Sequence, residues 1–159
     1  SHRVLLHAPC SVLVVKGAPT KVKHVLLAVE GPEDAEQLKG WLLKHPFKNP
    51  ADLHVLHVVP HPRFGDLKTV SSLKPWAQAA MKSAHALVRS IAGELNGPNY
   101  AISEQVLCGD PLEIIAQRAC RSDLLIVGSH GRTGLRRFLL GSVSHALVHR
   151  VGCPILIVR

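Results

Sequence analysis

Five short apolar runs, separated by longer amphipathic segments, constrain the fold of this chain more than any other feature of its sequence. The runs are residues 24–29, 53–59, 101–107, 124–127 and 155–158. Four of them are nearly continuous in valine, isoleucine and leucine, which is typical of parallel strands covered on both faces. The run 101–107 contains Ser103 and Glu104, so we expect this strand to lie nearer an edge of the sheet.

The segments between the runs have the period of amphipathic helices. Residues 34–44 and 76–95 carry apolar side chains at a 3.6-residue spacing. A third helix is expected after Asp110, which is a suitable N-cap, and a fourth near Ser142. Residues 60–72 are predicted to form a long surface loop. The alternation of strand and helix predicts an α/β fold with a doubly wound parallel sheet.

The first sixteen residues repeat the last sixteen. An ungapped alignment of 1–16 with 144–159 gives the identities Ser1/Ser144, His2/His145, Cys10/Cys153, Leu13/Leu156 and Val15/Val158. Roughly one identity is expected by chance from ordinary residue frequencies. We therefore predict that residues 1–16 are the last helix and strand of an upstream repeat, that 17–22 are a linker, and that 23–159 form one domain.

Composition excludes several classes of protein. No apolar run approaches the roughly 18 residues of a membrane span, and no signal peptide opens the chain. The cysteines at 10, 108, 120 and 153 show no disulfide framework, so we expect a cytoplasmic protein in which they are small buried hydrophobic residues. The formal net charge of +8 favours anionic partners. An aromatic content of 4% argues against a surface that stacks nucleic-acid bases.

A glycine-rich segment follows the strand at 124–127. Gly128 and Gly131 allow a ligand to approach the backbone, while Gly141 and Ser142 open the next helix with unpaired N–H groups. Ser142 and Ser144 add hydroxyl donors, and arginines at 132, 136 and 137 lie close enough in sequence to neutralise a polyphosphate. Because ligands of doubly wound sheets bind beyond the carboxyl ends of strands, we predict a phosphate site here.

The spacing G-x2-G-x9-G-[ST], met by Gly128, Gly131, Gly141 and Ser142, resembles the motif of the universal stress protein family, in its ATP-binding branch. The resemblance covers residues 21–159. It implies a five-stranded parallel sheet in the order 3-2-1-4-5, of the adenine-nucleotide α-hydrolase-like type. It also implies ATP as the ligand, with Mg²⁺ left open, and a stress or signalling regulator as the function. Family members associate through their last strands, so we expect residues 12–16 to pair antiparallel with 155–158, within the chain or in a dimer.

The resemblance also implies the residues of the site. Ala28 and Glu30 are expected to flank the nucleoside, and Val58 and Val127 to contact adenine. Phosphates are expected at Gly128, Gly131, Gly141, Ser142, Val143 and Ser144, with Arg132 nearby. His130 lies within the glycine segment, where phosphate contact and loop packing remain open alternatives. Glu30 stands where the family usually has aspartate, and this longer carboxylate alters the expected contact with ribose.

The sequence gives weaker support to a metal site or a catalytic site. His145 and His149 have helical spacing, and His54, His57 and His61 cluster around the second strand, but neither set has the further ligands that a metal site requires. No catalytic triad or Walker-type Gly-Lys-Ser sequence is present. We therefore expect a nucleotide binder. A weak ATPase or phosphotransferase is the alternative, with Glu30 or Asp110 as the base, and a basic nucleic-acid-binding module is a less favoured one.

Overall fold

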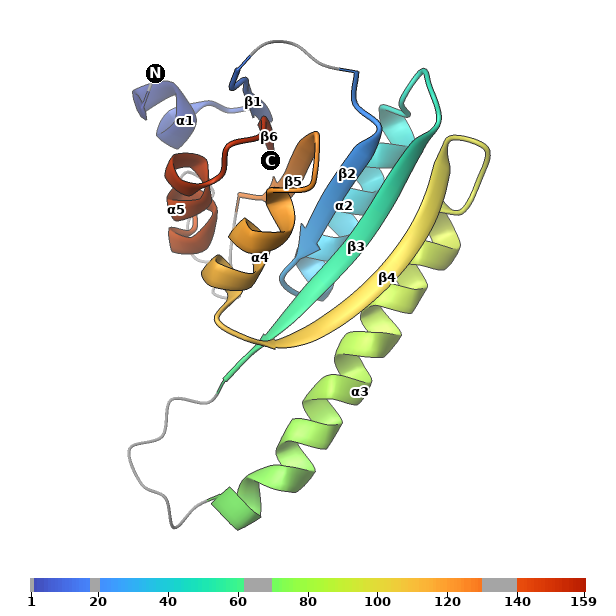
Figure 1. The fold of residues 1–159 in the computed structure, drawn as a ribbon, viewed down its shortest axis with the longest axis vertical. Coiled ribbons are helices and arrows are strands. Elements are labelled where there is room, and N and C mark those ends of the chain that lie inside the picture. The colour runs from blue at the N-terminus through green and yellow to red at the C-terminus, as the bar shows by residue number, and fades with distance from the viewer. Residues whose placement is uncertain (1, 18–20, 62–69, 130–139) are drawn as a thin grey trace.

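A six-stranded sheet forms the centre of the domain (Figure 1). The computed structural model describes residues 2–17, 21–61, 70–129 and 140–159. The strands are β1 (Val12–Val14), β2 (His24–Val29), β3 (Ala51–Pro60), β4 (Tyr100–Gly109), β5 (Leu124–Gly128) and β6 (Ile155–Val158), in the order β1-β6-β5-β2-β3-β4. Strands β2 to β6 are mutually parallel. The predicted doubly wound sheet is therefore confirmed, with β1 added beyond its β6 edge.

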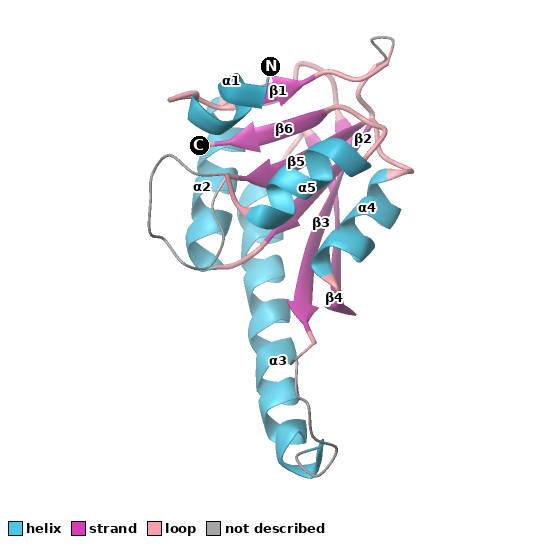
Figure 2. Cartoon of the chain, turned by 90° about the vertical axis from the view of Figure 1, so that its left-hand side faces the viewer, coloured by secondary structure: helices cyan, strands magenta, loops and turns pink. Residues whose placement is uncertain are grey.

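Helices cover both faces of the sheet (Figures 1 and 2). They are α1 (His2–His7), α2 (Pro32–Lys44), α3 (Val70–Leu95), α4 (Pro111–Ala119) and α5 (Ser142–Arg150). Helices α2 and α3 lie on one face, and α4 and α5 on the other. Asp110 caps α4 as predicted, because its Oδ1 accepts a hydrogen bond of 3.1 Å from the Glu113 N–H. None of the helices in the described part of the chain is long and apolar enough to cross a bilayer.

Two hydrophobic cores, one on each face, hold the central strands. Val25, Leu27 and Val29 of β2 pack toward α2 and α3, while the alternate residues Leu26 and Ala28 pack toward α4 and α5. Because successive side chains of a strand point to opposite faces, a strand covered on both faces is apolar throughout. This explains why the central strands appear as continuous apolar runs in the sequence.

The position of β4 and the first residue of α3 bear on two of the sequence predictions. β4 stands last in the strand order of the described residues, next to β3, so the predicted edge position of the polar run is confirmed. Helix α3 begins at Val70, earlier than the predicted 76, and includes Pro75. β3 continues to Pro60, so both elements extend into the predicted loop 60–72. Residues 62–69 lie outside the described part of the chain.

The N-terminal segment adds a strand to the free edge of β6. β1 pairs antiparallel with β6, with Leu13 opposite Leu156, as expected, although the strand ends at Val14 rather than residue 16. Beyond that strand, Lys16 Nζ donates hydrogen bonds of 2.5 Å to the backbone oxygens of Val148 and Val151 at the end of α5. A cation at the C-terminus of a helix satisfies carbonyl groups that lack partners within the helix.

The opposite end of the chain makes the matching contact. Arg159 Nη2 donates to the Leu5 carbonyl oxygen of α1. In the sequence repeat Lys16 is equivalent to Arg159, and Leu5 is equivalent to Val148. Each repeat therefore supplies a cation to the helix of the other, and the central Leu13–Leu156 pair joins equivalent residues. The two segments are related like the halves of a two-fold interface.

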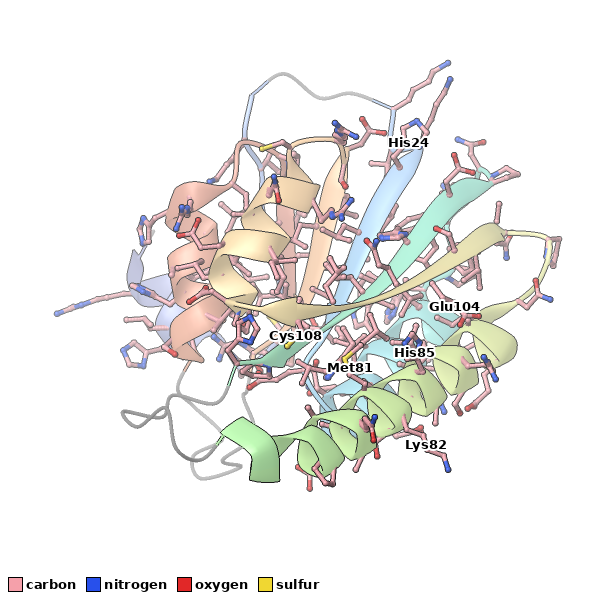
Figure 3. All side chains as sticks on the ribbon, turned by 60° about the horizontal axis from the view of Figure 1, so that its bottom comes forward. His24, Met81, Lys82, His85, Glu104 and Cys108 are labelled. Atoms are coloured by element: carbon pink, nitrogen blue, oxygen red, sulfur yellow. The ribbon has the colours of Figure 1, made fainter. Side chains whose placement is uncertain are left out.

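The prediction that all four cysteines are buried is wrong. Cys10, Cys108 and Cys120 are exposed, and Cys153 is partly buried. Cys10 lies between α1 and β1, Cys120 follows the last turn of α4, and Cys108 lies near the end of the edge strand β4 (Figure 3). Surface turns and edge strands leave side chains accessible whatever their polarity, and the sequence pattern alone did not distinguish these positions.

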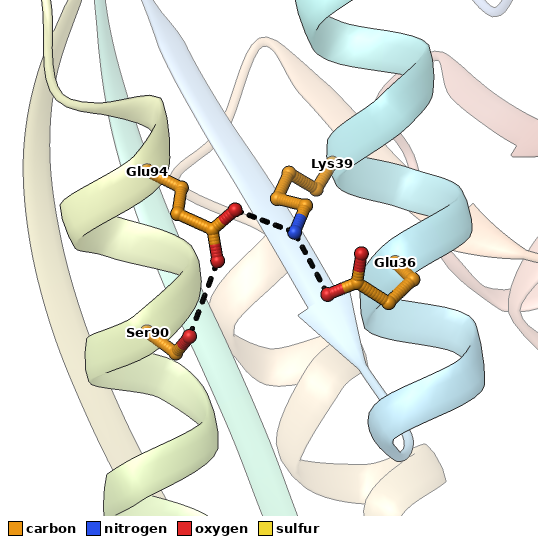
Figure 4. A network of polar contacts seen from close by, with 4 residues as sticks. All are labelled: Glu36, Lys39, Ser90 and Glu94. Atoms are coloured by element: carbon orange, nitrogen blue, oxygen red, sulfur yellow. Dashed lines mark hydrogen bonds and ion pairs between the residues drawn. The ribbon is translucent and has the colours of Figure 1, made fainter.

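A polar cluster joins α2 to α3 (Figure 4). Lys39 Nζ lies 2.7 Å from Glu36 Oε1 and 2.6 Å from Glu94 Oε2, and Ser90 donates to the other Glu94 oxygen at 3.2 Å. Hydrogen bonds to both carboxylates raise the pKa of Lys39, and the bond from Lys39 lowers the pKa of Glu94. The alkyl chain of Lys39 is largely buried, while its ammonium group lies between two partly exposed carboxylates.

Candidate functional site

A cavity of about 830 Å³ opens at the carboxyl ends of the parallel strands. It lies where the chain order of the sheet reverses, between β2 and its neighbours β3 and β5. Its lining residues come from those three strands and from all four helices that cover the sheet: Ala28–Asp34, Gln37, His57–Pro60, Ala80, Ser83, Ala84, Leu87, Pro111, Ile115, Val127, Gly128, Val143, Ser144 and Leu147. Topological switch points of this kind are the usual ligand sites of doubly wound sheets.

One wall of the cavity is apolar. Ala28 and Val127 are partners in the register of β2 and β5, and Val58 lies on the adjacent β3. All three side chains are buried. His57 beside them is held by a 2.8 Å hydrogen bond between its Nδ1 and the Val29 carbonyl oxygen, in which the ring nitrogen is the donor. A flat apolar group such as a purine ring fits a wall of this composition.

The other wall is the start of α5. Ser144 Oγ donates to the Gly128 carbonyl oxygen at 2.8 Å, which ties the first turn of α5 to the end of β5. The Gly141 N–H donates to the Ser129 oxygen at 2.8 Å, and Ser129 is itself fully buried. The first N–H groups of a helix have no acceptor within it and carry the positive end of its dipole. This wall therefore suits an anionic group.

The structure brings together most of the predicted site residues that it describes. Those lining the cavity are Ala28, Glu30, Val58, Val127, Gly128, Val143 and Ser144. Gly141 and Ser142 stand at the start of α5 without contributing to the lining. The predicted contacts of His130, Gly131 and Arg132 lie outside the described residues.

Asp34 is a residue of the cavity that the sequence analysis missed. Its Oδ2 accepts a 2.8 Å hydrogen bond from the Glu30 N–H, and its buried Oδ1 has no partner among the described residues. A Cβ built on Gly128 would stand 2.9 Å from Asp34 Cγ and closer still to Oδ1. The glycine therefore makes room for this carboxyl group. An acidic residue in the first turn of a helix is so common that nothing in the sequence singled it out.

Burial dominates the electrostatics of Asp34. Desolvation and, to a smaller extent, the charge of Glu30 raise the pKa of its carboxyl group to about 7, against the lowering effect of the Glu30 N–H. Glu33 adds a third carboxyl group to the same side of the cavity. The described lining residues include no lysine and no arginine. On this side the cavity therefore presents negative charge to any ligand that enters.

The histidine groupings do not assemble a metal centre. The rings of His145 and His149 meet edge to face with centroids 5.1 Å apart, and His61 Nδ1 lies 3.5 Å from the Cys108 sulfur. His54 Nδ1 lies 2.8 Å from Ser103 Oγ across β3 and β4. Within the described ranges, no group of three or more histidine, cysteine, aspartate or glutamate side chains is placed to hold a metal ion.

A doubly wound α/β domain with a cavity at its switch point belongs to a class of folds whose ligands bind at that place. The family model described as the universal stress protein family matches residues 21–159, and the chain belongs to that family. A putative universal stress protein of Staphylococcus epidermidis is 30% identical over 145 residues, covering 86% of this chain and 84% of the relative.

Two universal stress proteins of Mycobacterium tuberculosis also match. One is 40% identical over 62 residues, which is 39% of this chain and 21% of the relative. The other is 25% identical over 165 residues, covering all of this chain and 54% of the relative. The chain thus spans about half the length of that second relative.

Solved structures share the fold. The hypothetical protein MJ0577 superimposes with a TM-score of 0.76 at 24% identity, covering 87% of this chain and 96% of its own. An Arabidopsis thaliana family member with AMP bound gives 0.61 at 19% identity, covering 86% and 90%. A universal stress protein in complex with cAMP gives 0.62 at 21% identity, covering 88% and 99%. At these identities the likeness shows a common fold.

Proposed function

We propose that this domain binds an adenine nucleotide, with ATP as the expected ligand, and acts as a nucleotide-dependent regulator. The observation that carries the proposal is the cavity at the switch point, where the apolar wall of Ala28, Val58 and Val127 faces the start of α5. Structural neighbours crystallised with AMP and with cAMP support this assignment. The bound nucleotide would then bias the conformation or association state of the protein.

The residues present fit an adenine nucleotide. The volume of about 830 Å³ lies within the usual range of small-molecule sites, about 300–1,000 Å³. The adenine ring would lie against the apolar wall, and the phosphates would meet the first turn of α5 at Val143 and Ser144. Mg²⁺ enters this proposal only as a counter-ion of the phosphates, because magnesium usually binds through one or two carboxylates together with substrate phosphates.

Calorimetric titration with ATP and GTP tests the proposal. We expect tighter binding of ATP than of GTP, and loss of ATP binding after Gly141→Val, which places a branched side chain directly before the turn of α5 that would meet the phosphates. Gly141 has an ordinary backbone conformation with φ of −59°, so valine introduces no backbone strain. Gly152→Val at the other end of α5, with open space around it, is the control. Equal affinity for the two nucleotides, or binding of neither at millimolar concentration, would refute the assignment.

Binding without fast turnover is the second part of the proposal. Asp110, one of the two candidate bases, is engaged as the cap of α4 through the Glu113 N–H. Glu30 remains as the acidic candidate in the cavity. Groups that bind ground-state phosphates do not by themselves lower the barrier to phosphoryl transfer. An ATPase assay should therefore give rates far below the roughly 1–100 per second of kinases. Turnover near one per second that Glu30→Gln abolished without loss of affinity would instead identify a catalyst.

We propose further that residues 1–16 are the last helix and strand of another universal stress protein domain in a tandem arrangement. Three apolar residues of this segment are exposed, whereas their equivalents in the closing repeat are buried. The pairs are Val4 at 59% with Leu147 at 0%, Leu13 at 53% with Leu156 at 6%, and Val15 at 61% with Val158 at 1%. The body of a domain covers these positions in the closing repeat, so a second domain body fits the exposed set.

Self-association tests the tandem proposal. Uncovered apolar patches promote association, so the chain should form concentration-dependent oligomers in light scattering. Leu13→Glu with Val15→Glu should abolish them, whereas Leu43→Glu, which replaces an equally exposed leucine on α2, should not. A monomeric wild type at all concentrations would contradict the proposal.

We propose the cytoplasm as the compartment, because the four cysteines are unpaired and three are exposed.

A further inference from the structure

The position of Asp34 places a titratable carboxyl group against the anion-binding wall of the cavity. Gly128 is adjacent to the Asp34 carboxyl group, and its carbonyl oxygen is bonded to Ser144 in the first turn of α5. A phosphate group at that turn would therefore lie near the carboxyl group. The Oδ1 atom is buried and lacks a hydrogen-bond partner among the described residues, which is unusual for a buried polar atom. A proton on this carboxyl group removes the cost of a buried charge that lacks a partner.

The neighbouring charges favour the neutral form of Asp34 when an anion is bound. The other titratable groups that line the cavity among the described residues are Glu30, Glu33 and His57. On α2 itself, Lys39 is held by Glu36 and Glu94. Beyond β6, Arg159 bonds to the Leu5 carbonyl oxygen. A bound phosphate makes the electrostatic potential at Asp34 more negative. In a poorly solvated site, a nearby negative charge favours the protonated form of a carboxyl group.

We propose that Asp34 is a recognition residue that selects ligands by charge, holding its proton while an anionic nucleotide occupies the cavity. This inference rests on the proposed nucleotide-binding function. In the protonated state the carboxyl group carries no charge, and its Oδ2 still accepts from the Glu30 N–H. In the ionised state the carboxylate repels the phosphate. Binding of an anionic nucleotide therefore consumes a proton from solution once Asp34 is ionised in the free protein.

The experiment compares AMP and adenosine binding between pH 6 and pH 9 in the wild type, in Asp34→Asn and in Asp52→Asn. Asparagine keeps an acceptor for the Glu30 N–H and cannot ionise. Asp52 lies at the opposite end of β3 and controls for the loss of one negative charge. Because every protein sees the same ligand at each pH, the ratio of wild-type to variant affinity cancels the titration of AMP itself.

We expect the wild-type affinity for AMP, relative to Asp34→Asn, to fall about tenfold for each pH unit above 7. The affinity of wild type relative to Asp52→Asn should stay constant with pH. Adenosine, which carries no phosphate, should show a much weaker dependence. If the ratio of the wild-type affinity for AMP to the affinity of Asp34→Asn stayed constant from pH 6 to 9, or rose with pH, the inference would be overturned. The proposed function would remain intact. Failure of all three proteins to bind AMP at every pH would overturn this inference, and failure to bind ATP as well would overturn the proposed function.

A second measurement on the wild type covers the case in which Asp34→Asn does not fold. Calorimetry at pH 8 in two buffers of different ionisation enthalpy gives the number of protons taken up with AMP. We expect close to one proton per ligand, because Asp34 is then mostly ionised in the free protein and AMP is already a dianion. No proton uptake at this pH would overturn the inference.

Discussion

At the scale of single residues, the pair formed by Gly128 and Asp34 explains why the end of β5 requires a glycine. In the usual view of a phosphate loop, glycine leaves space for the ligand. Here the space beside the Gly128 Cα contains the Asp34 carboxyl group, which reaches across from the first turn of α2. The two positions are 94 residues apart in the chain, from 34 to 128, and they depend on each other sterically.

Substitution of Gly128 by alanine should therefore destabilise the domain. The new Cβ would displace a largely buried side chain, and overpacking of this kind costs about 1–3 kcal/mol. In an Asp34→Ala background the same substitution should cost much less, so a double-mutant cycle by urea denaturation should show a coupling of about 1 kcal/mol or more. Gly152→Ala, which meets no atom within 4 Å, is the control. Additive effects of the two substitutions would mean that the side chains do not compete for this space.

Asp34 should also make stability depend on pH. Burial raises its pKa from 3.8 to about 7, so the folded protein binds this proton more tightly than the unfolded chain. The contribution of Asp34 to stability is fully present below about pH 4 and is lost as the pH rises through about 7. The unfolding free energy of wild type should thus fall by up to about 4 kcal/mol relative to Asp34→Asn across that window. Urea titrations at intervals between pH 4 and 8.5 measure the difference, and parallel curves would contradict it.

At the scale of secondary-structure elements, the polar cluster around Lys39 fixes α3 against α2. α3 is the longest helix in the described part of the chain, with 26 residues, and its N-terminal part reaches beyond the sheet (Figures 1 and 2). Ala80, Ser83, Ala84 and Leu87 of α3 line the cavity. The bond from Lys39 to Glu94 therefore anchors the far end of a helix whose middle forms a wall of the site.

Removal of the Glu94 charge should weaken this anchor. Glu94→Gln should lower the urea midpoint at pH 7, because Lys39 loses one of two anionic partners in a nearly buried position. The pKa of Glu94 is lowered by Lys39, so its contribution is present above the ordinary pKa of glutamate and is lost as the pH falls through the lowered value. The difference between wild type and variant should accordingly disappear once the pH has fallen below that lowered pKa. Glu104→Gln on the outer strand β4 (Figure 3) is the control, and an equal effect of both changes at pH 7 would contradict the expectation.

At the scale of the whole molecule, the sheet is extended by a segment from the other end of the chain. β1 covers the edge of β6 along three paired residues, and the hydrogen bonds of Lys16 and Arg159 hold the flanking helices. Leu5 of α1 joins the core formed with α4 and α5. The N-terminal segment is thus packed as a part of the domain.

Deletion of residues 1–16 should expose the β6 edge. Unpaired edge strands recruit other chains, so the shortened protein should form higher oligomers or precipitate, as measured by light scattering at several concentrations. It should also unfold at a lower temperature, since it loses the buried Leu5 and the strand pairing. A shortened protein that matches the full chain in both measurements would show that the segment adds nothing to the fold.

Most of the architecture follows from the sequence, whereas the site follows only in part. The buried parallel strands were predictable because burial on both faces requires continuous apolar runs, and the resemblance to the family had indicated Ala28, Val58 and Val127, which line the cavity. Asp34 was not predictable, because its role depends on its distance from Gly128 and not on neighbouring residues in the chain. The contribution of α3 to the cavity was missed for the same reason. Exposure of Cys108 depends on its place on an edge strand, which residue type alone does not reveal.

Lys16 caps the end of α5 and Arg159 bonds to α1, and these two reciprocal contacts affect how the chain tolerates mutation. In a pair of identical subunits, one substitution at a self-complementary interface alters two contacts at once. Here the two halves are encoded separately, so a mutation at Lys16 leaves the cap made by Arg159 intact. The two positions hold different cations, and the accepting carbonyl groups belong to different residues, Leu5 and Val148. Two such segments within one chain can therefore keep the geometry of a symmetric pair while their residues differ chemically.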